Sequence, residues 1–217
     1  MTVEQIYTGC LAQGAYYIVS NGEAAIIDPL RETEPYLKKL QKDGVVLKYV
    51  FETHFHADFV SGHIDLAAAT GATIVYGPNT VTKYPVHVAR DGEVFKLGNL
   101  SFEVLHTPGH TLESSCYLLK DETGKDIAIF TGDTLFVGDV GRPDLAQKAN
   151  EISMVSGRFK KRCAYKWWFK ISLARASTKL RRKIMSSTDL SYQRCVAILL
   201  SSTAAFSFMF HSLSFNS

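Results

Sequence analysis

The side chains best suited to chemistry gather in the segment Thr53-His54-Phe55-His56-Ala57-Asp58. This segment lies at the end of an apolar run, LKYVFET at residues 47–53, which is typical of a buried β-strand. In extended backbone alternate side chains point the same way, so His54, His56 and Asp58 are expected to project into one space. Packing explains them poorly, because burying such groups unpaired costs several kcal/mol. Imidazole and carboxylate groups together bind zinc, iron or manganese, so the pattern indicates a metal site.

Two more polar side chains follow predicted strands in the same way. His110 lies in the segment TPGHT, after the predicted strand 100–106, and Asp133 lies in TGD, after the apolar run IAIF. In open α/β folds, binding sites form beyond the carboxyl ends of the strands. The sequence therefore predicts one site to which all three motifs contribute.

The elements that position these motifs are typical of an α/β protein. Hairpins are expected at Asn21-Gly22, at Gly98-Asn99 and at residues 122–125, where apolar runs flank turn-forming residues. Helical spacing predicts helices over residues 34–43 and 58–70, each ended by a glycine, and residues 73–77 form a further predicted strand.

The balance of acidic and basic residues changes near residue 150. Its 217 residues are 46% hydrophobic and 21% charged, a globular composition. Residues 1–150 hold 12 basic and 19 acidic residues, whereas residues 151–217 hold 12 basic and 2 acidic ones. We therefore expect a domain over 1–150 and an atypical basic tail over 151–217. The tail is interpreted as a frame-shifted or truncated product in preference to a segment that binds membranes or nucleic acid, so neither partner is expected.

From its bulk features we expect a cytoplasmic protein. The amino terminus has no basic start followed by an apolar run, so a secretory signal is not predicted. The apolar stretch 195–210 is shorter than the roughly 20 residues that a membrane helix needs. The four cysteines are widely spaced, which favours free thiols in a reducing compartment over disulfides or a thiolate zinc site.

The order HxHxD, TPGH and TGD resembles that of the metallo-β-lactamase superfamily, whose fold is an αββα sandwich with the metal at one edge. Three longer segments, 53–63, 106–114 and 130–148, are similar to the persulfide dioxygenases, in particular the bacterial type often fused to rhodanese domains. The resemblance covers about residues 1–150. It implies that the second half of the sandwich is incomplete or replaced by an unrelated tail.

The resemblance implies an enzyme with one Fe(II) per chain, held by His54, His110 and Asp133, with zinc as a substitute metal. This set is the facial triad of two histidines and one carboxylate found in non-haem iron oxygenases. The implied reaction oxidises a low-molecular-weight thiol persulfide, such as glutathione persulfide, with O₂ to sulfite and the free thiol.

Three further residues take supporting roles under this resemblance. His56 and Asp58 would orient the ligands or hydrogen-bond to metal-bound water, or they are remnants of an ancestral site. Arg142 matches a family position that contacts the carboxylate of the thiol carrier, and the alternative is a structural salt bridge to Asp139 or Asp144.

The alternative enzyme is a thioester hydrolase similar to glyoxalase II, which holds two metals. There the first metal would be bound by His54, His56 and His110, and the second by Asp58, the following residue and a later histidine, with Asp133 bridging. Here Phe59 follows Asp58 and cannot bind a metal, and no later histidine has the required context. A catalytically inactive fragment is a third hypothesis, and a homodimer stays open.

Overall fold

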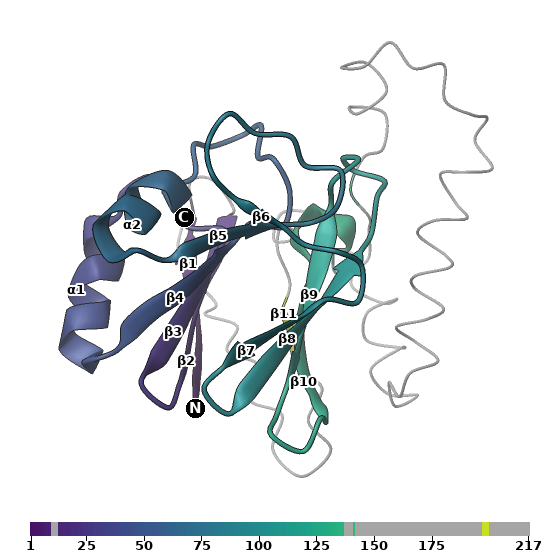
Figure 1. Cartoon of the computed structure of the whole chain (residues 1–217). Coiled ribbons are helices and arrows are strands. Elements are labelled where there is room, and N and C mark those ends of the chain that lie inside the picture. Colours follow the sequence, from purple (N-terminus) through teal and green to yellow (C-terminus); the bar gives the residue numbers. More distant parts are fainter. Residues whose placement is uncertain (10–12, 137–140, 142–196, 200–217) are drawn as a thin grey trace, which may run out of the picture.

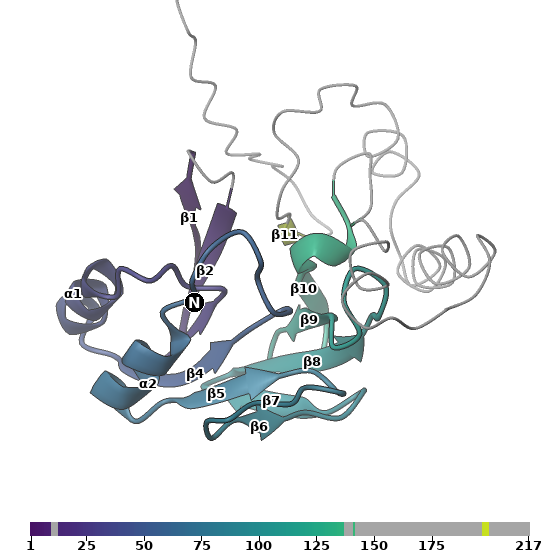
Figure 2. The same cartoon turned by 90° about the horizontal axis from the view of Figure 1, so that it is seen from above.

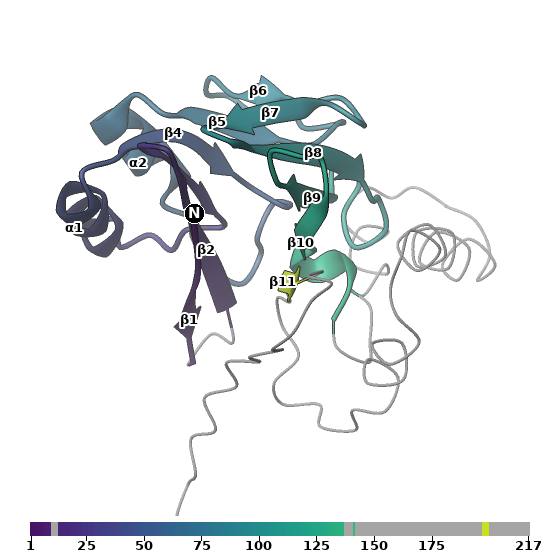
Figure 3. The same cartoon turned by 90° about the horizontal axis from the view of Figure 1, so that it is seen from below.

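Two β-sheets lie against each other in the computed structural model, which describes residues 1–9, 13–136, 141 and 197–199. The first sheet has the order β1 (Thr2–Thr8), β2 (Gln13–Ser20), β3 (Glu23–Ile27), β4 (Val46–Phe51), β5 (Thr73–Tyr76) and β6 (His87–Val88). The second has the order β11 (Ala197–Leu199), β10 (Asp126–Phe130), β9 (Ser115–Lys120), β8 (Leu100–His106) and β7 (Val94–Leu97). The helices are α1 (Glu34–Asp43), α2 (His63–Thr70) and a 3₁₀ turn at Gly132–Thr134. Both α-helices cover the face of the first sheet that points away from the second (Figures 1, 2 and 3).

Strands at the centre of the first sheet bury both of their faces. In β2, Tyr16 and Ile18 point into the core between the two sheets, whereas Tyr17 points into the core beneath the helices. The inter-sheet core is completed by large side chains of both sheets, among them Phe51, Phe102, Tyr117 and Phe130. Burial on both faces explains why these strands read as continuous apolar runs rather than as an alternation.

Parallel pairing brings the ends of β3 and β4 to the same edge of the first sheet. Strands β3, β4 and β5 are parallel, and α1 and α2 make the two crossovers. Asp28 follows β3 and Thr53 follows β4, and the backbone N–H of Thr53 donates to Asp28 Oδ1 at 2.8 Å. Gly44 ends α1 as expected, in the left-handed conformation with φ +64°.

The α/β sandwich predicted from the sequence is confirmed, and so are its three hairpins. The start of the second helix was predicted wrongly, because α2 begins at His63 and not at Asp58. The preceding residues are tied to neighbouring loops instead: Gly62 N–H donates to Pro29 O at 3.1 Å, and Ser61 forms an isolated bridge with Leu30. Of the basic tail only 197–199 are described, and they pair with β10.

No helix among the described residues is long and apolar enough to cross a membrane.

Candidate metal centre

Three separate loops bring His54, His110 and Asp133 together at one edge of the sandwich. His54 follows β4, His110 lies between β8 and β9, and Asp133 lies in the 3₁₀ turn after β10. Their ligand atoms all lie within 4.8 Å of one another. Nε2 of His110 is 3.4 Å from Asp133 Oδ2, and Nε2 of His54 is 4.0 Å from the same oxygen. Donors about 2.0–2.2 Å from a shared ion have such separations, so the group fits one metal ion.

Thr53 and Asp28 fix the orientation of His54. The Thr53 hydroxyl donates to Asp28 Oδ2 at 2.8 Å and lies 3.0 Å from Nδ1 of His54. Since the hydroxyl has a single proton and gives it to the carboxylate, it must accept a hydrogen bond from Nδ1–H. Nε2 is then the unprotonated nitrogen, and it is the nitrogen that faces Asp133. Burial and the neighbouring His56 lower the pKa of His54 to about 3, which keeps the ring neutral and able to bind a metal.

The loop that carries Asp133 is shaped by Gly132. This glycine has φ +47°, and a Cβ there would lie 2.3 Å from the Thr53 hydroxyl oxygen. The close approach places the Asp133 loop directly on the Thr53–His54 segment. Burial raises the pKa of Asp133, His110 opposes this effect, and the negative charge of Asp58 adds to it. A divalent ion would favour the ionised carboxylate.

His56 lies beside His54, with ring centroids 4.2 Å apart, but it belongs to a second group of possible metal-binding residues, with Asp28 and Glu52. Residues after β4 leave the extended conformation. Nε2 of His56 lies 3.1 Å from Asp28 Oδ1 and 3.5 Å from Glu52 Oε2. Burial alone would lower the pKa of His56, but the two carboxylates outweigh it and raise the pKa to about 9. Burial and the nearby Asp28 raise the pKa of Glu52 to about 8.

The roles of Asp28, Glu52 and Thr53 were not predicted from the sequence. Each of them follows an apolar strand run, and for Asp28 and Glu52 an acid in that place is the signal that could have found them. Glu52 also accepts from the Ser61 hydroxyl at 2.6 Å, and its Oε1 lies 3.5 Å from Nδ1 of buried His63.

The remaining predicted site residues are not part of the candidate metal-binding group or lie outside the described residues. Asp58 is exposed and does not belong to either of the two candidate metal-binding groups in the described part of the chain. Arg142 lies outside the described residues, as do its alternative partners Asp139 and Asp144. Cys116 is a buried free thiol, and its Sγ lies 3.4 Å from the Thr107 hydroxyl.

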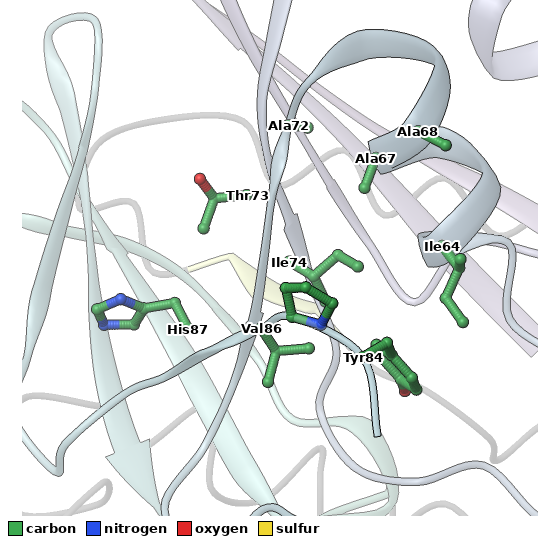
Figure 4. Close-up of a pocket in the computed structure, with 10 residues that line it drawn as sticks. Ile64, Ala67, Ala68, Ala72, Thr73, Ile74, Tyr84, Val86 and His87 are labelled. Carbon is green, nitrogen blue, oxygen red and sulfur yellow. The ribbon is translucent and has the colours of Figure 1, made fainter. Parts of the chain in front are cut away.

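An apolar pocket lies between α2, β5 and the segment that leads to β6 (Figure 4). It is lined by Ile64, Ala67, Ala68, Ala72, Thr73, Ile74, Tyr84, Pro85, Val86 and His87. None of the candidate metal ligands contributes to it. Tyr84 connects this pocket to His63, because its hydroxyl lies 2.9 Å from Nε2 of that histidine.

A two-sheet sandwich with a histidine- and carboxylate-rich edge defines a class of metal-binding α/β proteins. The model of the Metallo-beta-lactamase superfamily matches residues 8–176, and the chain belongs to this family. The resemblance seen in the three motifs is thereby confirmed.

Known relatives share the fold over part of their length. A hydroxyacylglutathione hydrolase of Methylococcus capsulatus is 40% identical over 124 residues, which is 56% of this chain and 46% of the relative. A metallo-beta-lactamase structure from Staphylococcus aureus has a TM-score of 0.68 and 34% identity, covering 79% of this chain and 52% of that one. ETHE1 from Myxococcus xanthus has a TM-score of 0.59 and 34% identity, covering 66% of this chain and 62% of that one. The chain spans about half the length of the curated relatives it matches.

Proposed function

We propose that the chain carries the metal centre of an iron(II)-dependent persulfide dioxygenase. The observation that supports this most is the donor set of two imidazoles and one carboxylate, whose ligand atoms lie within 4.8 Å of one another. Two histidines and one carboxylate are typical of mononuclear iron oxygenases, whereas a third imidazole favours hydrolytic zinc sites. ETHE1 from Myxococcus xanthus, at 34% identity, is among the structural neighbours.

The proposed reaction converts a thiol persulfide, O₂ and water into the thiol, sulfite and two protons. When bound, Fe(II) supplies a redox-active ion with open positions at which the persulfide sulfur and O₂ can meet, which removes much of the orientational cost. His54 and His110 bind the metal through neutral nitrogens, and Asp133 adds one negative charge. Thr53 and Asp28 hold His54 in the required tautomer. Asp58 lies close enough to raise the pKa of Asp133, and in this proposal it orients water at the centre. Arg142 binds a carboxylate of the thiol carrier.

Hydrolysis of a hydroxyacylglutathione thioester is the second candidate. It is supported by the names of curated relatives with 36–40% identity. Phe59 argues against it, because it occupies the position after Asp58 where a second metal needs a ligand and packs on His56 instead. Both candidates share a glutathione-derived substrate, so they differ mainly in metal and chemistry.

Metal analysis and two assays separate these candidates. The protein is loaded anaerobically with Fe(II) or with Zn(II), and metal per chain is measured. O₂ uptake and sulfite release are then followed with glutathione persulfide, and thiol release with a hydroxyacylglutathione. The proposal predicts one Fe per chain and sulfite formation that is lost in His110→Ala together with iron retention. Two Zn per chain with thioester cleavage would establish the hydrolase, and the absence of both activities would indicate an inactive fragment.

A further inference from the structure

The loop that carries His110 is closed by hydrogen bonds of its own. At its base the backbone N–H of Thr107 donates to Ser114 O at 2.8 Å. Across the loop the hydroxyls of Thr111 and Ser114 lie 2.7 Å apart, and the N–H of Thr111 donates to the same Ser114 hydroxyl at 3.1 Å. These contacts tie His110 to the rest of its loop. The position of this ligand relative to His54 therefore depends on what holds the whole loop in place.

Glu113 connects this loop to the segment that carries His54. Its carboxylate oxygen Oε1 accepts a hydrogen bond from the backbone N–H of Phe55 at 3.0 Å, across 58 positions of the chain. Two residues further on, the N–H of Ser115 donates to Thr53 O at 2.9 Å. Together the two bonds hold the residues immediately before and after His54.

Burial makes the Glu113 contact a strong one. The residue is 7% exposed, so water has little access to the carboxylate. A buried carboxylate is costly unless hydrogen bonds stabilise it, and a hydrogen bond to an ionised acceptor is about twice as strong as one between neutral groups. Glu113 belongs to neither of the two candidate metal-binding groups in the described part of the chain. Its contact with Phe55 N–H thus acts on the spacing of the ligands, and not on the metal directly.

We propose that Glu113 is a positioning residue, which sets the distance between His54 and His110 by holding their two loops together through the backbone N–H of Phe55. This inference rests on the metal centre of the proposed function, but it applies to iron or zinc and to oxidation or hydrolysis alike. The acceptor must reach the N–H of Phe55, so the length of the side chain matters more than its charge. Without the acceptor the two loops separate, and their donors no longer meet at one ion.

Three variants of Glu113 distinguish reach from charge. Glu113→Ala removes the acceptor, Glu113→Asp keeps the charge but is one methylene shorter, and Glu113→Gln keeps an acceptor oxygen at the original reach. Affinity for Zn(II) is measured by competition with a chromophoric chelator, and the absorption bands of bound Co(II) report the geometry of the donors. We expect the affinity to fall about tenfold or more in the Ala and Asp variants, with altered Co(II) bands, and to stay within about threefold of the wild type in the Gln variant, with unchanged bands.

Glu23→Ala is the matched control for general damage. Glu23 also accepts from the backbone N–H of a distant loop, that of Gly98 at 2.7 Å. It begins β3, however, whereas Asp28 beside the candidate metal centre follows the other end of that strand. This variant should lose stability in urea unfolding and keep its affinity for zinc. If Glu113→Ala does not fold, the Asp and Gln variants carry the test.

Three results would overturn the inference. These are a wild-type zinc affinity in every folded Glu113 variant, a loss in Glu113→Gln as large as in Glu113→Asp, and a loss in Glu23→Ala as large as in Glu113→Ala. The second would mean that the charge of Glu113 acts on the ion, and the third that metal affinity only follows stability. A wild type that binds zinc as expected but forms no sulfite would remove the proposed function and leave this role of Glu113 intact.

Discussion

Replacing Thr53 by valine tests the orientation of His54 most directly. Valine keeps the shape of threonine but removes the hydroxyl that donates to Asp28 Oδ2 at 2.8 Å and accepts from His54 Nδ1 at 3.0 Å. Both partners are buried and cannot turn to water instead. A hydrogen bond to a charged group contributes about 2 kcal/mol, and a buried donor left unsatisfied costs about 1 kcal/mol or more. The expected loss in the free energy of unfolding is therefore about 3 kcal/mol.

The same change should weaken metal binding. Without the hydroxyl, nothing in the described surroundings of Nδ1 selects the tautomer in which Nε2 is unprotonated. Loss of such an orienting partner weakens metal affinity by about 10- to 100-fold. The assays are urea unfolding of the metal-free protein and competition for Zn(II) against a chromophoric chelator, both at fixed pH.

Thr53→Ser is the control, because it keeps the hydroxyl and removes one methyl group. It should lose about 1 kcal/mol of stability and retain its metal affinity. If Thr53→Val matches Thr53→Ser in both measurements, the hydroxyl does not orient His54 and the reasoning fails.

Three further outcomes are expected. Gly132→Ala should lose about 3 kcal/mol in urea unfolding, because its φ is +47° and the new Cβ would lie 2.3 Å from the Thr53 hydroxyl oxygen. Tyr117→Phe should lose about 1 kcal/mol, since the buried hydroxyl donates to Glu52 O at 2.8 Å. Burial raises the pKa of Cys116 to about 11, so about one thiol in a thousand is ionised at pH 8 and iodoacetamide should label it only after unfolding, as followed by peptide mass spectrometry.

Each outcome has a matched comparison. A Cβ at Gly109 meets nothing within 4 Å, so Gly109→Ala should be close to wild type, and equal stabilities of the two alanine variants would contradict the close approach at Gly132. Tyr7 is 48% exposed, and Tyr7→Phe should leave stability unchanged. Labelling of Cys116 in the folded protein at the rate of a small thiol would show that the surroundings of this cysteine open readily, and it would contradict the prediction.

Much of the fold could be predicted because its signals are local. The Asn21-Gly22 turn lies between two apolar runs and does form a hairpin, with both residues at positive φ. Gly44 does end α1. The start of α2 was predicted too early, since residues 58–62 have helical spacing, but Ser61 and Gly62 contact the loop after β3 instead. Spacing along the chain does not reveal a contact with a distant loop.

The sequence by itself determined which residues could bind a metal and which strands deliver them: His54, His110 and Asp133 each follow an apolar run, and such runs must pair in a sheet. It did not determine that Nε2 of His56 lies next to two acids. Only the tertiary structure decided this, because parallel pairing of β3 and β4 places Asp28 beside Glu52, and these two buried carboxylates lie 3.1 Å and 3.5 Å from that nitrogen. The direction of a side chain depends on charged groups that folding brings close to it. The alternation of residues along one strand does not reveal those groups.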